Sequence, residues 1–371
     1  MAGIYIHIPF CKSRCKYCDF FSTTHLSRRD EYVSALLREW QMRQQAFFAL
    51  LQERQETVNT IYIGGGTPST LDISSLQLIL DQVLHSLKRV NLEEVREITQ
   101  EVNPGDVTAE KAAAWRSMGI NRLSMGVQSF NDTLLQLIGR RHTAQQALDA
   151  VATAKAAGFN NISIDLMYAL PSQTMELWQA DVAQALSLGV QHLSSYGLIY
   201  EEGTVLTTLL EHGVIEAVDE DTEMLMYDYL VAQLTANGYE HYEVSNFALP
   251  GRQSQHNSSY WCDTPYLGLG AGAHSYDGLS RWWNPSNLDT YIADAQTHTL
   301  QTEREELTAE ARHMERIMLG LRTNQGIAIE LVDSAKAEYY IQQGLLYQEG
   351  DRLIATTQGF HILNRIIEDL V

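Results

Sequence analysis

Hydrophobic residues follow a helical repeat near the start of the chain. After a short apolar run from Ile4 to Ile8, apolar residues recur at Val33, Leu36, Leu37 and Trp40. Residues three and four positions apart lie on the same side of a helix. We therefore predict a long helix with one buried face in this region.

Short β-rich runs alternate with helical segments over about the first 200 residues. The β-rich runs are NTIYI, EITQEVNP, RLSMGVQSF, NISIDLMY and HLSSYGLIY. The amphipathic segments between them are SSLQLILDQVLHSL, TAEKAAAWRSMG, AQQALDAVATAKAAG and ELWQADVAQALSLG. Strands separated by single helices pair in parallel through right-handed crossovers. Counting the first apolar run, six such units predict an α/β fold with an open, partial (β/α)6 barrel, because a closed barrel needs eight.

The pattern changes in the last third of the chain. Residues 241–300 are rich in aromatics, glycine and histidine, and we expect irregular structure that closes the barrel mouth. In residues 301–371, EREELTAEARHMERIMLGLRT predicts a helix, and GLLYQEGDRLIATT predicts a hairpin with its turn at residues 349–351. With a last amphipathic helix, GFHILNRIIEDLV, these elements predict a winged-helix-like α+β domain. The core domain is then expected to span residues 1–240.

Composition and charge narrow the class of protein. Of 371 residues, 45% are apolar and 19% charged, as in globular proteins, and the net charge is −20. Nucleic acid is not an expected partner, because its binding depends on clustered Lys and Arg. No apolar run approaches the roughly 18 to 20 residues of a membrane span, and MAGIYIHIPF lacks the features of a signal peptide. We therefore expect a cytoplasmic protein.

Polar and glycine residues follow the predicted strands. Cys11 comes after the first strand and Gly64 to Thr67 after the second, while Glu101, Gln128 and Asp165 end the next three. In parallel α/β folds, ligand-binding groups gather at the carboxyl ends of strands. We expect these residues to face one mouth of the barrel.

Three of the four cysteines lie within eight positions, in CKSRCKYC, at Cys11, Cys15 and Cys18. In a reducing compartment such clustering indicates metal or redox chemistry. One alternative is a structural zinc site with a fourth ligand from elsewhere. The candidates for that fourth ligand are Cys262, His7 and Asp19. The other alternative is an iron–sulfur cluster with three protein ligands and one open iron, which the absence of a second cysteine pair favours.

The Cys-x3-Cys-x2-Cys spacing, with the aromatic Tyr17 before the last cysteine, resembles that of radical S-adenosylmethionine (SAM) proteins. The resemblance implies a [4Fe–4S] cluster held by Cys11, Cys15 and Cys18. It also implies that the open iron binds the amino and carboxylate groups of SAM. The family fold is the partial barrel that the strand pattern predicts.

The candidate SAM contacts come from the strand ends. Glycines in GGGTP, Gly64 to Pro68, let a ligand approach the backbone closely, as in the family element that binds the methionyl amino group. Carboxylates suit ribose hydroxyls and a guanidinium suits a carboxylate, whereas each residue alone could be a salt-bridged residue of the barrel rim. A resemblance to the oxygen-independent coproporphyrinogen oxidase branch implies SAM contacts at Tyr5, Tyr17, Gly65, Gly66, Thr67, Glu101, Gln128, Arg140 and Asp165.

The resemblance to this branch covers nearly the whole chain, including YIHIPFC, LSMGVQSF, DLMYALPSQT, YEVSNFA and YLGLGAGAHS. Coproporphyrinogen oxidases carry a fourth cysteine where this chain has Phe20, and they have a longer leader. HNSSYW, which begins at His256, instead resembles the His-Asn-x-x-Tyr-Trp hallmark of a sister group of heme chaperones. The resemblance implies heme as a ligand, with His256 as its axial ligand and Tyr260 and Trp261 as aromatic walls.

Other roles for these residues stay open. A histidine beside Asn in an irregular segment is often a hydrogen-bonded structural residue, and that alternative applies to His256. Cys262 could offer a thiolate to heme, but it lies outside the hallmark. For His274, a packing role is the simpler interpretation.

Two functions of different class follow. The first is a heme-binding and transfer protein whose partners are acceptor hemoproteins, such as those of respiratory chains, with transient docking on membrane proteins and a cluster-dependent homodimer as further expectations. The second is an enzyme in which reductive SAM cleavage starts the oxidation of a porphyrinogen. Both need Cys11, Cys15 and Cys18, whereas Phe20 and HNSSYW favour the first.

Overall fold

Six adjacent parallel strands form the wall of an open barrel in the computed structural model, which describes residues 1–371. The strands are β1 Ala2–Ile8, β2 Val58–Gly65, β3 Glu93–Val102, β4 Arg122–Gln128, β5 Ile162–Tyr168 and β6 His192–Gly197. They pair in sequence order with parallel register, so the predicted partial barrel is confirmed.

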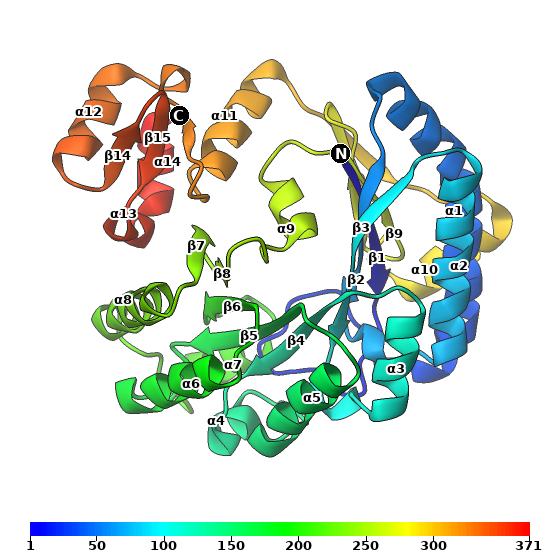
Figure 1. The fold of residues 1–371 in the computed structure, drawn as a ribbon, viewed down its shortest axis with the longest axis horizontal. Helices are drawn as coiled ribbons and strands as arrows, with labels where there is room; N and C mark the ends of the chain where they lie inside the picture. The colour runs from blue at the N-terminus through cyan, green and yellow to red at the C-terminus, as the bar shows by residue number, and fades with distance from the viewer.

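Helices follow each strand, and most of them cover the outer face of the wall (Figure 1). These are α1 Arg29–Arg54, α2 Ile73–Arg89, α3 Ala109–Ser117, α4 Asp132–Leu137, α5 Ala144–Ala156, α6 Met175–Ser187, α7 Val205–Glu211 and α8 Glu220–Ala236. Single 3-10 turns lie at Leu26–Arg28, Pro68–Thr70, Pro104–Asp106 and Ile329–Leu331. Threonine side chains cap α3, α5 and α6 by accepting a backbone N–H of the first turn, which fixes where each helix begins.

The first of these helices has the predicted buried face. Val33, Leu36 and Trp40 are buried and Leu37 is half-buried, so the helical repeat points at the sheet. These side chains belong to the main hydrophobic core between the helices and the outer face of the barrel wall. Burial of this face stabilises α1 against the barrel.

The inner face of the barrel wall is polar, in contrast to the outer face. On β5, for example, Ile162, Ile164 and Leu166 belong to the main core, while Ser163 and Asp165 alternate with them. Successive side chains of a strand point to opposite faces, so the hydrophilic ones point into the lumen. The barrel therefore holds hydrogen-bonding groups rather than a hydrophobic filling.

Short strands extend the sheet beyond both edges of the barrel. They are β7 Glu240–Glu243, β8 Asn246–Ala248, β9 Tyr266–Leu269, β10 His274–Tyr276, β11 Ser280–Trp283 and β12 Glu303–Glu306. β8 pairs with β6, and β9 pairs with β1. The prediction of irregular structure over 241–300 is therefore wrong. The helix predicted to start in EREE is also corrected, because these four residues form β12 and Thr308 caps the helix that follows.

Helix α9, Gln255–Tyr260, lies in the gap between the two barrel edges, and α10, Leu288–Thr297, packs beside α1 (Figure 1). The last elements form a separate module with its own hydrophobic core. They are α11 Ala309–Gly320, β13 Ile327–Ala328, α12 Ser334–Gln342, β14 Leu346–Glu349, β15 Arg352–Ala355, α13 Thr357–His361 and α14 Leu363–Leu370. β14 and β15 form the predicted hairpin, with φ of 60° at Gly350 in its turn.

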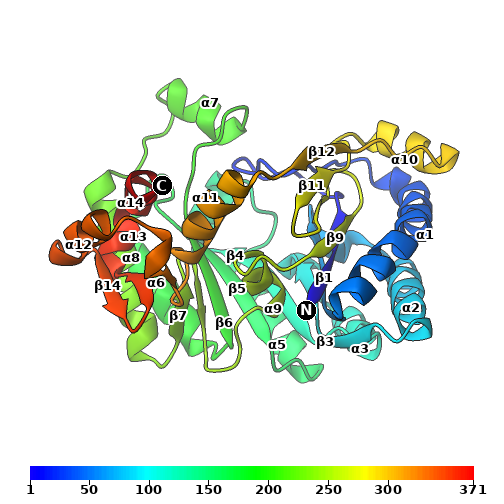
Figure 2. The same ribbon diagram turned by 90° about the horizontal axis from the view of Figure 1, so that it is seen from above.

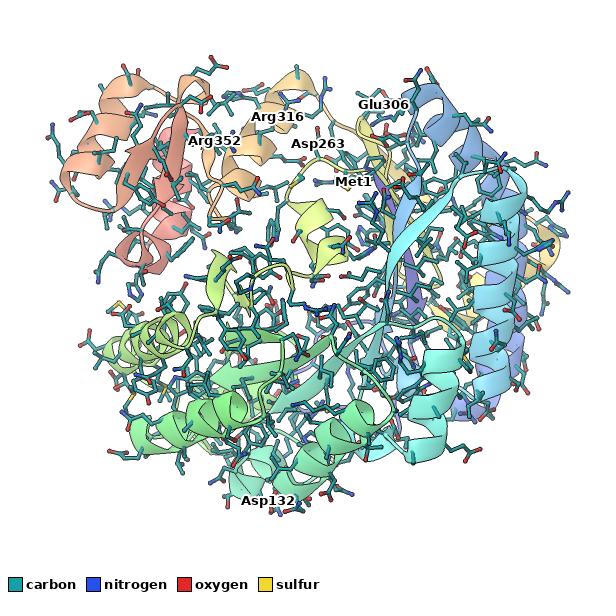
Figure 3. All side chains as sticks on the ribbon, in the orientation of Figure 1. Met1, Asp132, Asp263, Glu306, Arg316 and Arg352 are labelled. Carbon is teal, nitrogen blue, oxygen red and sulfur yellow. The ribbon has the colours of Figure 1, made fainter.

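Two ion pairs and one side-chain hydrogen bond join this C-terminal module to the barrel, and one of the ion pairs is Arg281 of β11 with Glu315 of α11 at 2.8 Å. His361 Nε2 lies 2.8 Å from Asp228 Oδ1 on α8. Arg316 of α11 faces Asp263, which follows α9, at 3.9 Å (Figure 3). The module thus contacts the segment that fills the barrel gap. None of the helices combines the length and apolar content that a membrane span requires.

A buried carboxylate ties α1 to the strands added beside β1. Glu39 is fully buried, and its Oε1 accepts hydrogen bonds from Arg43 Nε at 2.9 Å and Asn284 Nδ2 at 2.7 Å. Its Oε2 accepts from the Gly270 N–H and the Tyr291 hydroxyl, both at 2.7 Å. Four donors from three parts of the chain therefore meet on one side chain.

We predict that Glu39→Gln lowers the free energy of unfolding by about 2 kcal/mol or more, because Arg43 loses its charged partner and one amide must replace four acceptor contacts. Urea unfolding followed by circular dichroism measures the change. The exposed Glu53→Gln on the same helix is the control and should stay within about 0.5 kcal/mol of wild type. Equal effects of the two substitutions would contradict the prediction.

Candidate functional site

A cavity of about 560 Å³ opens at the carboxyl ends of the barrel strands. The structure brings together around it most of the residues that the sequence singled out. These are Cys11, Cys15, Tyr17, Cys18, Gly65, Gly66, Thr67, Glu101, Gln128, Arg140 and Asp165. The expectation that the strand ends face one mouth is therefore confirmed.

The cysteine loop follows β1 and is held by backbone hydrogen bonds. The Cys11 N–H donates to Thr23 O at 2.9 Å, and the Lys16 N–H donates to Ile138 O at 3.0 Å. The Leu206 N–H, at the start of α7, donates to Lys16 O at 2.9 Å. Helix α7 projects from the barrel beside this loop (Figure 2). The loop is therefore fixed by neighbours on two sides without regular secondary structure of its own.

Polar groups reach two of the three thiols. The Cys11 Sγ lies 3.3 Å from Thr67 Oγ1, and Arg140 Nη1 donates to Cys15 Sγ at 3.4 Å. Cys11 is buried, whereas Cys15 and Cys18 are half-buried at the cavity surface. A cluster held by these three thiols would lie at the cavity mouth and would leave one iron free to bind a ligand.

The donor set fits an iron–sulfur cluster better than zinc. His7 is occupied, because its Nε2 donates to Phe21 O at 3.0 Å and its Nδ1 accepts from the Tyr5 hydroxyl at 3.0 Å. Cys262 is exposed and does not line the cavity. No three His, Cys, Asp or Glu side chains gather as closely as a single metal ion requires. Three thiols at one cavity mouth suit a cluster, whose irons bind one thiolate each.

The glycine turn after β2 is required by its neighbours. A Cβ on Gly66 would lie 2.7 Å from Pro9 O and 3.0 Å from the Cys11 Sγ. Gly65 has φ of 113°, which favours glycine. The absence of side chains therefore lets the turn pass directly over the cysteine loop and leaves its backbone facing the cavity.

Glu101 is the most firmly held polar group of the site. Its Oε1 accepts from the Tyr62 hydroxyl at 2.8 Å and its Oε2 from the Gly65 N–H at 3.0 Å. Burial raises the pKa of Glu101 to about 7. A carboxyl group in this position is oriented by the glycine turn and can accept hydrogen bonds from hydroxyls in the cavity.

Asp165, Gln128 and Arg140 complete the cavity wall on the next strands. Burial raises the pKa of Asp165 to about 6, and Ser124 Oγ lies 3.4 Å from its Oδ1. Gln128 adopts the left-handed conformation with φ of 70°, which a non-glycine residue adopts rarely and which often marks a functional position. Arg140 is half-buried beside Cys15, and Gly126 O accepts from its Nη2. The Arg140 guanidinium and the carboxyl groups of Glu101 and Asp165 are thus among the charged groups that line the ligand space.

The two tyrosines predicted to contact SAM lie in different places. Tyr17 lines the cavity and packs in a small hydrophobic cluster with Leu198 and Leu206. Tyr5 does not line this cavity. Its ring stacks near Tyr62 with 6.1 Å between the ring centroids, deeper in the lumen.

His256 lies inside the barrel, and its side chain lines neither of the main cavities. Its Nδ1 is 2.8 Å from Thr60 Oγ1, its Nε2 is 2.9 Å from the Tyr260 hydroxyl, and its ring stacks on Tyr62. Burial, followed by the charge of Arg122, lowers its pKa to about 3, so the ring is neutral. Both ring nitrogens are therefore engaged, as in the structural alternative. Axial ligation by His256 requires that α9 leave this position.

A second cavity of about 480 Å³ lies next to α9 and shares Tyr62 and Glu101 with the first. Of the other HNSSYW residues, Asn257, Tyr260 and Trp261 line it. The further lining residues are Tyr5, Tyr196, Glu243, Val244, Ser245, Asn246 and Arg322. Tyr62, which lines both cavities, was not among the site residues predicted from the sequence. Only the alternation of inward and outward residues on β2 could have indicated that its side chain faces the lumen.

Comparisons with known proteins agree with this geometry. The model of the radical SAM superfamily matches residues 5–184. The fold is similar to that of coproporphyrinogen III oxidase (HemN) from Escherichia coli, with a TM-score of 0.81 and 22% identity over 99% of this chain and 89% of that one. The open barrel and its cysteine loop thus define the class, a radical SAM protein with a [4Fe–4S] cluster and SAM as its expected cofactors.

Curated relatives narrow the class further. The chain is 39% identical to the heme chaperone HemW of Lactococcus lactis, over 98% of this chain and 96% of the relative. It is 38% identical to HemW of Bacillus subtilis over 88% and 85%, and 34% identical to HemW of Mycobacterium tuberculosis over 100% and 94%. The chain belongs to the HemW family of heme chaperones.

We predict that Cys15→Ala abolishes the visible absorption of the cluster and lowers the iron content, while the chain stays folded. The half-buried Cys15 lies outside the hydrophobic cores, so its removal leaves them intact. Absorption spectra, iron analysis and circular dichroism of the reconstituted protein measure these effects. Cys262→Ala is the matched control and should keep its cluster. An unchanged iron content in Cys15→Ala would refute the cluster assignment.

We also predict a pH effect on stability from Glu101. Its pKa is about 7 in the folded chain, against 4.5 when exposed. Its stabilising contribution is therefore complete below pH 4.5 and is lost as the pH rises through 7, because the unfolded chain ionises first. Wild type should lose roughly 3 kcal/mol over this range relative to Glu101→Gln, measured by urea unfolding at a series of pH values. Parallel pH profiles would contradict the raised pKa.

Proposed function

We propose that this protein binds heme and transfers it to acceptor hemoproteins, and that a [4Fe–4S] cluster and SAM occupy the cavity at the barrel mouth. The observation that carries this proposal is the position of HNSSYW. Its Asn257, Tyr260 and Trp261 line a cavity that adjoins the candidate SAM site. Aromatic walls suit a flat macrocycle. Heme bound at α9 would therefore lie next to the cofactor cavity.

The residues of the mouth suit the proposed cofactors. Cys11, Cys15 and Cys18 would hold the cluster, and the turn at Gly65 would receive the methionyl amino group of SAM. Bound there, the cluster would supply an open iron site and a one-electron reductant. Arg140, next to Cys15, would hold the SAM carboxylate.

Carboxyl groups suit the other end of SAM. Glu101 and Asp165 would accept hydrogen bonds from the ribose hydroxyls, with Gln128 beside them. Tyr17 packs beneath the cysteine loop and would support the cofactor from below.

His256 is proposed as the axial heme ligand after a rearrangement of α9. In the closed arrangement Thr60 and Tyr260 hold the ring. The helix has only six residues, and its first N–H groups rest on Glu97, so release involves few contacts. A neutral imidazole, as the low pKa of His256 indicates, is the form that binds iron.

The enzyme alternative receives less support. Phe20 is 73% exposed at the rim of the first cavity, at the position where coproporphyrinogen oxidases have a fourth cysteine.

Further proposals about partners are acceptor proteins of respiratory chains, transient docking on membrane proteins and a cluster-dependent homodimer. They rest on the resemblance and on no contact within the chain.

The test is an anaerobic titration of the cluster-loaded protein with hemin, followed by Soret absorption. Wild type should saturate near one equivalent, and His256→Ala should bind at least tenfold more weakly, because it lacks the axial ligand. Thr60→Val removes one hydrogen bond that retains the ring and should speed binding. Cys262→Ala is the control and should match wild type. Non-saturating binding in all variants would overturn the heme proposal and direct attention to porphyrinogen turnover with SAM.

A further inference from the structure

A fully buried arginine in the barrel lumen has no partner. Arg122, the first residue of β4, is 1% exposed. Its Nε and Nη1 are buried without a hydrogen bond, and it takes part in none of the ion pairs of the structure. A guanidinium stays charged in proteins. Buried charges are normally paired, so this one lacks an anion.

The strand register places Arg122 at the level of the second cavity. Tyr5 pairs with Tyr62, Tyr62 with Thr99, and Thr99 with Arg122 on the four consecutive strands. Tyr5 and Tyr62 line the second cavity. The Thr99 hydroxyl, next to Arg122, is likewise buried without a partner. Unpaired donors therefore lie together behind the aromatic wall of that cavity.

The histidines around Arg122 do not neutralise it. His192 is held between Ser163 Oγ and the Tyr242 hydroxyl, both at 2.7 Å. Burial, followed by the charge of Arg122, lowers the pKa values of His192 and His256, so both rings are neutral. Their nitrogens are already used within the chain and leave the guanidinium without an acceptor.

The nearby carboxyl groups are also held elsewhere. Both oxygens of Glu101 are engaged by the Tyr62 hydroxyl and the Gly65 N–H. Asp165 lies further along the barrel toward the mouth, near Ser124. The buried Glu97, on the same face of β3 as Thr99, accepts the N–H groups of Gln255 and His256, both at 3.1 Å. None of the three carboxyl groups forms an ion pair with Arg122, so a carboxylate from a ligand would complete its pairing.

We propose that Arg122 anchors a carboxylate of a ligand that enters the lumen through the second cavity. A planar guanidinium matches a carboxylate in shape and charge. This inference rests on the proposed function, since heme carries two propionates and HNSSYW lines the same cavity. The carboxylate of SAM, which the proposed function assigns to Arg140, is the other source of the same chemistry, and the experiment separates the two.

The test compares hemin with hemin dimethyl ester, whose propionates are blocked, by Soret titration of the cluster-loaded protein. Wild type should bind hemin roughly 10- to 100-fold more tightly than the ester. Only hemin has a free carboxylate that can accept a charged hydrogen bond from Arg122. Arg122→Gln should bind both at the affinity of the ester, and Arg122→Lys should keep part of the preference. The exposed Arg89→Gln is the matched control and should behave as wild type.

Several results would overturn the inference. Wild type alone provides one such result: equal affinities for hemin and hemin dimethyl ester would overturn the inference, even if Arg122→Gln failed to fold. A preference lost in Arg322→Gln but kept in Arg122→Gln would assign the carboxylate to the rim of the cavity. If Arg122 has only a structural role, Arg122→Gln should have a lower melting temperature without ligand and the same ratio of hemin affinity to ester affinity as wild type. If Arg122 is an unpaired charge, its removal should not lower the melting temperature.

The failure of the heme proposal gives a different result. If wild type binds neither hemin nor the ester, the SAM affinities of wild type and Arg122→Gln are compared to decide whether Arg122 binds the carboxylate of SAM. A 10-fold or greater loss in the variant would assign the anchored carboxylate to SAM. Equal SAM affinities in that case would leave Arg122 without a ligand and overturn the inference.

Discussion

The incomplete closure of the barrel determines most of this structure. Six parallel strands cannot meet, so β1 and β6 would each present an unpaired edge, and unpaired backbone groups are costly unless covered. The chain covers one edge with β9 and the other with β8. The remaining gap is filled by α9, whose first N–H groups rest on the buried Glu97. The hallmark sequence therefore lies in this gap, where Asn257, Tyr260 and Trp261 line the second cavity.

A polar lumen is the second consequence. Because the helices supply the hydrophobic core outside the wall, the inward residues are free to be hydrophilic. Burial there favours uncharged forms, which raises the pKa of Glu101 and Asp165 and lowers that of His192 and His256. Most groups in the lumen meet this constraint through hydrogen bonds to a neighbouring strand. Arg122 does not meet it, because its guanidinium stays charged and makes no ion pair within the chain.

The sequence predicts those features that depend on local position. The cysteine loop, the glycine turn and Glu101 all follow from where strands end, and the structure brings them to one mouth. Features that depend on packing escaped prediction. Strands of three or four residues, such as β8 and β10, are too short to show the alternation of polar and apolar residues that predicts a strand. The strand β12, EREE, lacks this alternation because all four of its residues are exposed and polar. The direction of the His256 ring is likewise set by contacts with Thr60, which lies 196 residues away.

The closed position of His256 bears on how a carrier can release its cargo. If heme binds only when α9 has opened, the free energy of opening is subtracted from the binding energy, and each 1.4 kcal/mol weakens the affinity tenfold. Two hydrogen bonds and one aromatic stack hold the ring, which together contribute roughly 2 to 4 kcal/mol. That cost lowers the affinity by about 30- to 1,000-fold relative to an open site. The same contacts would re-form on release of heme, so under the proposed mechanism the packing of α9 would favour transfer to an acceptor that needs no such opening.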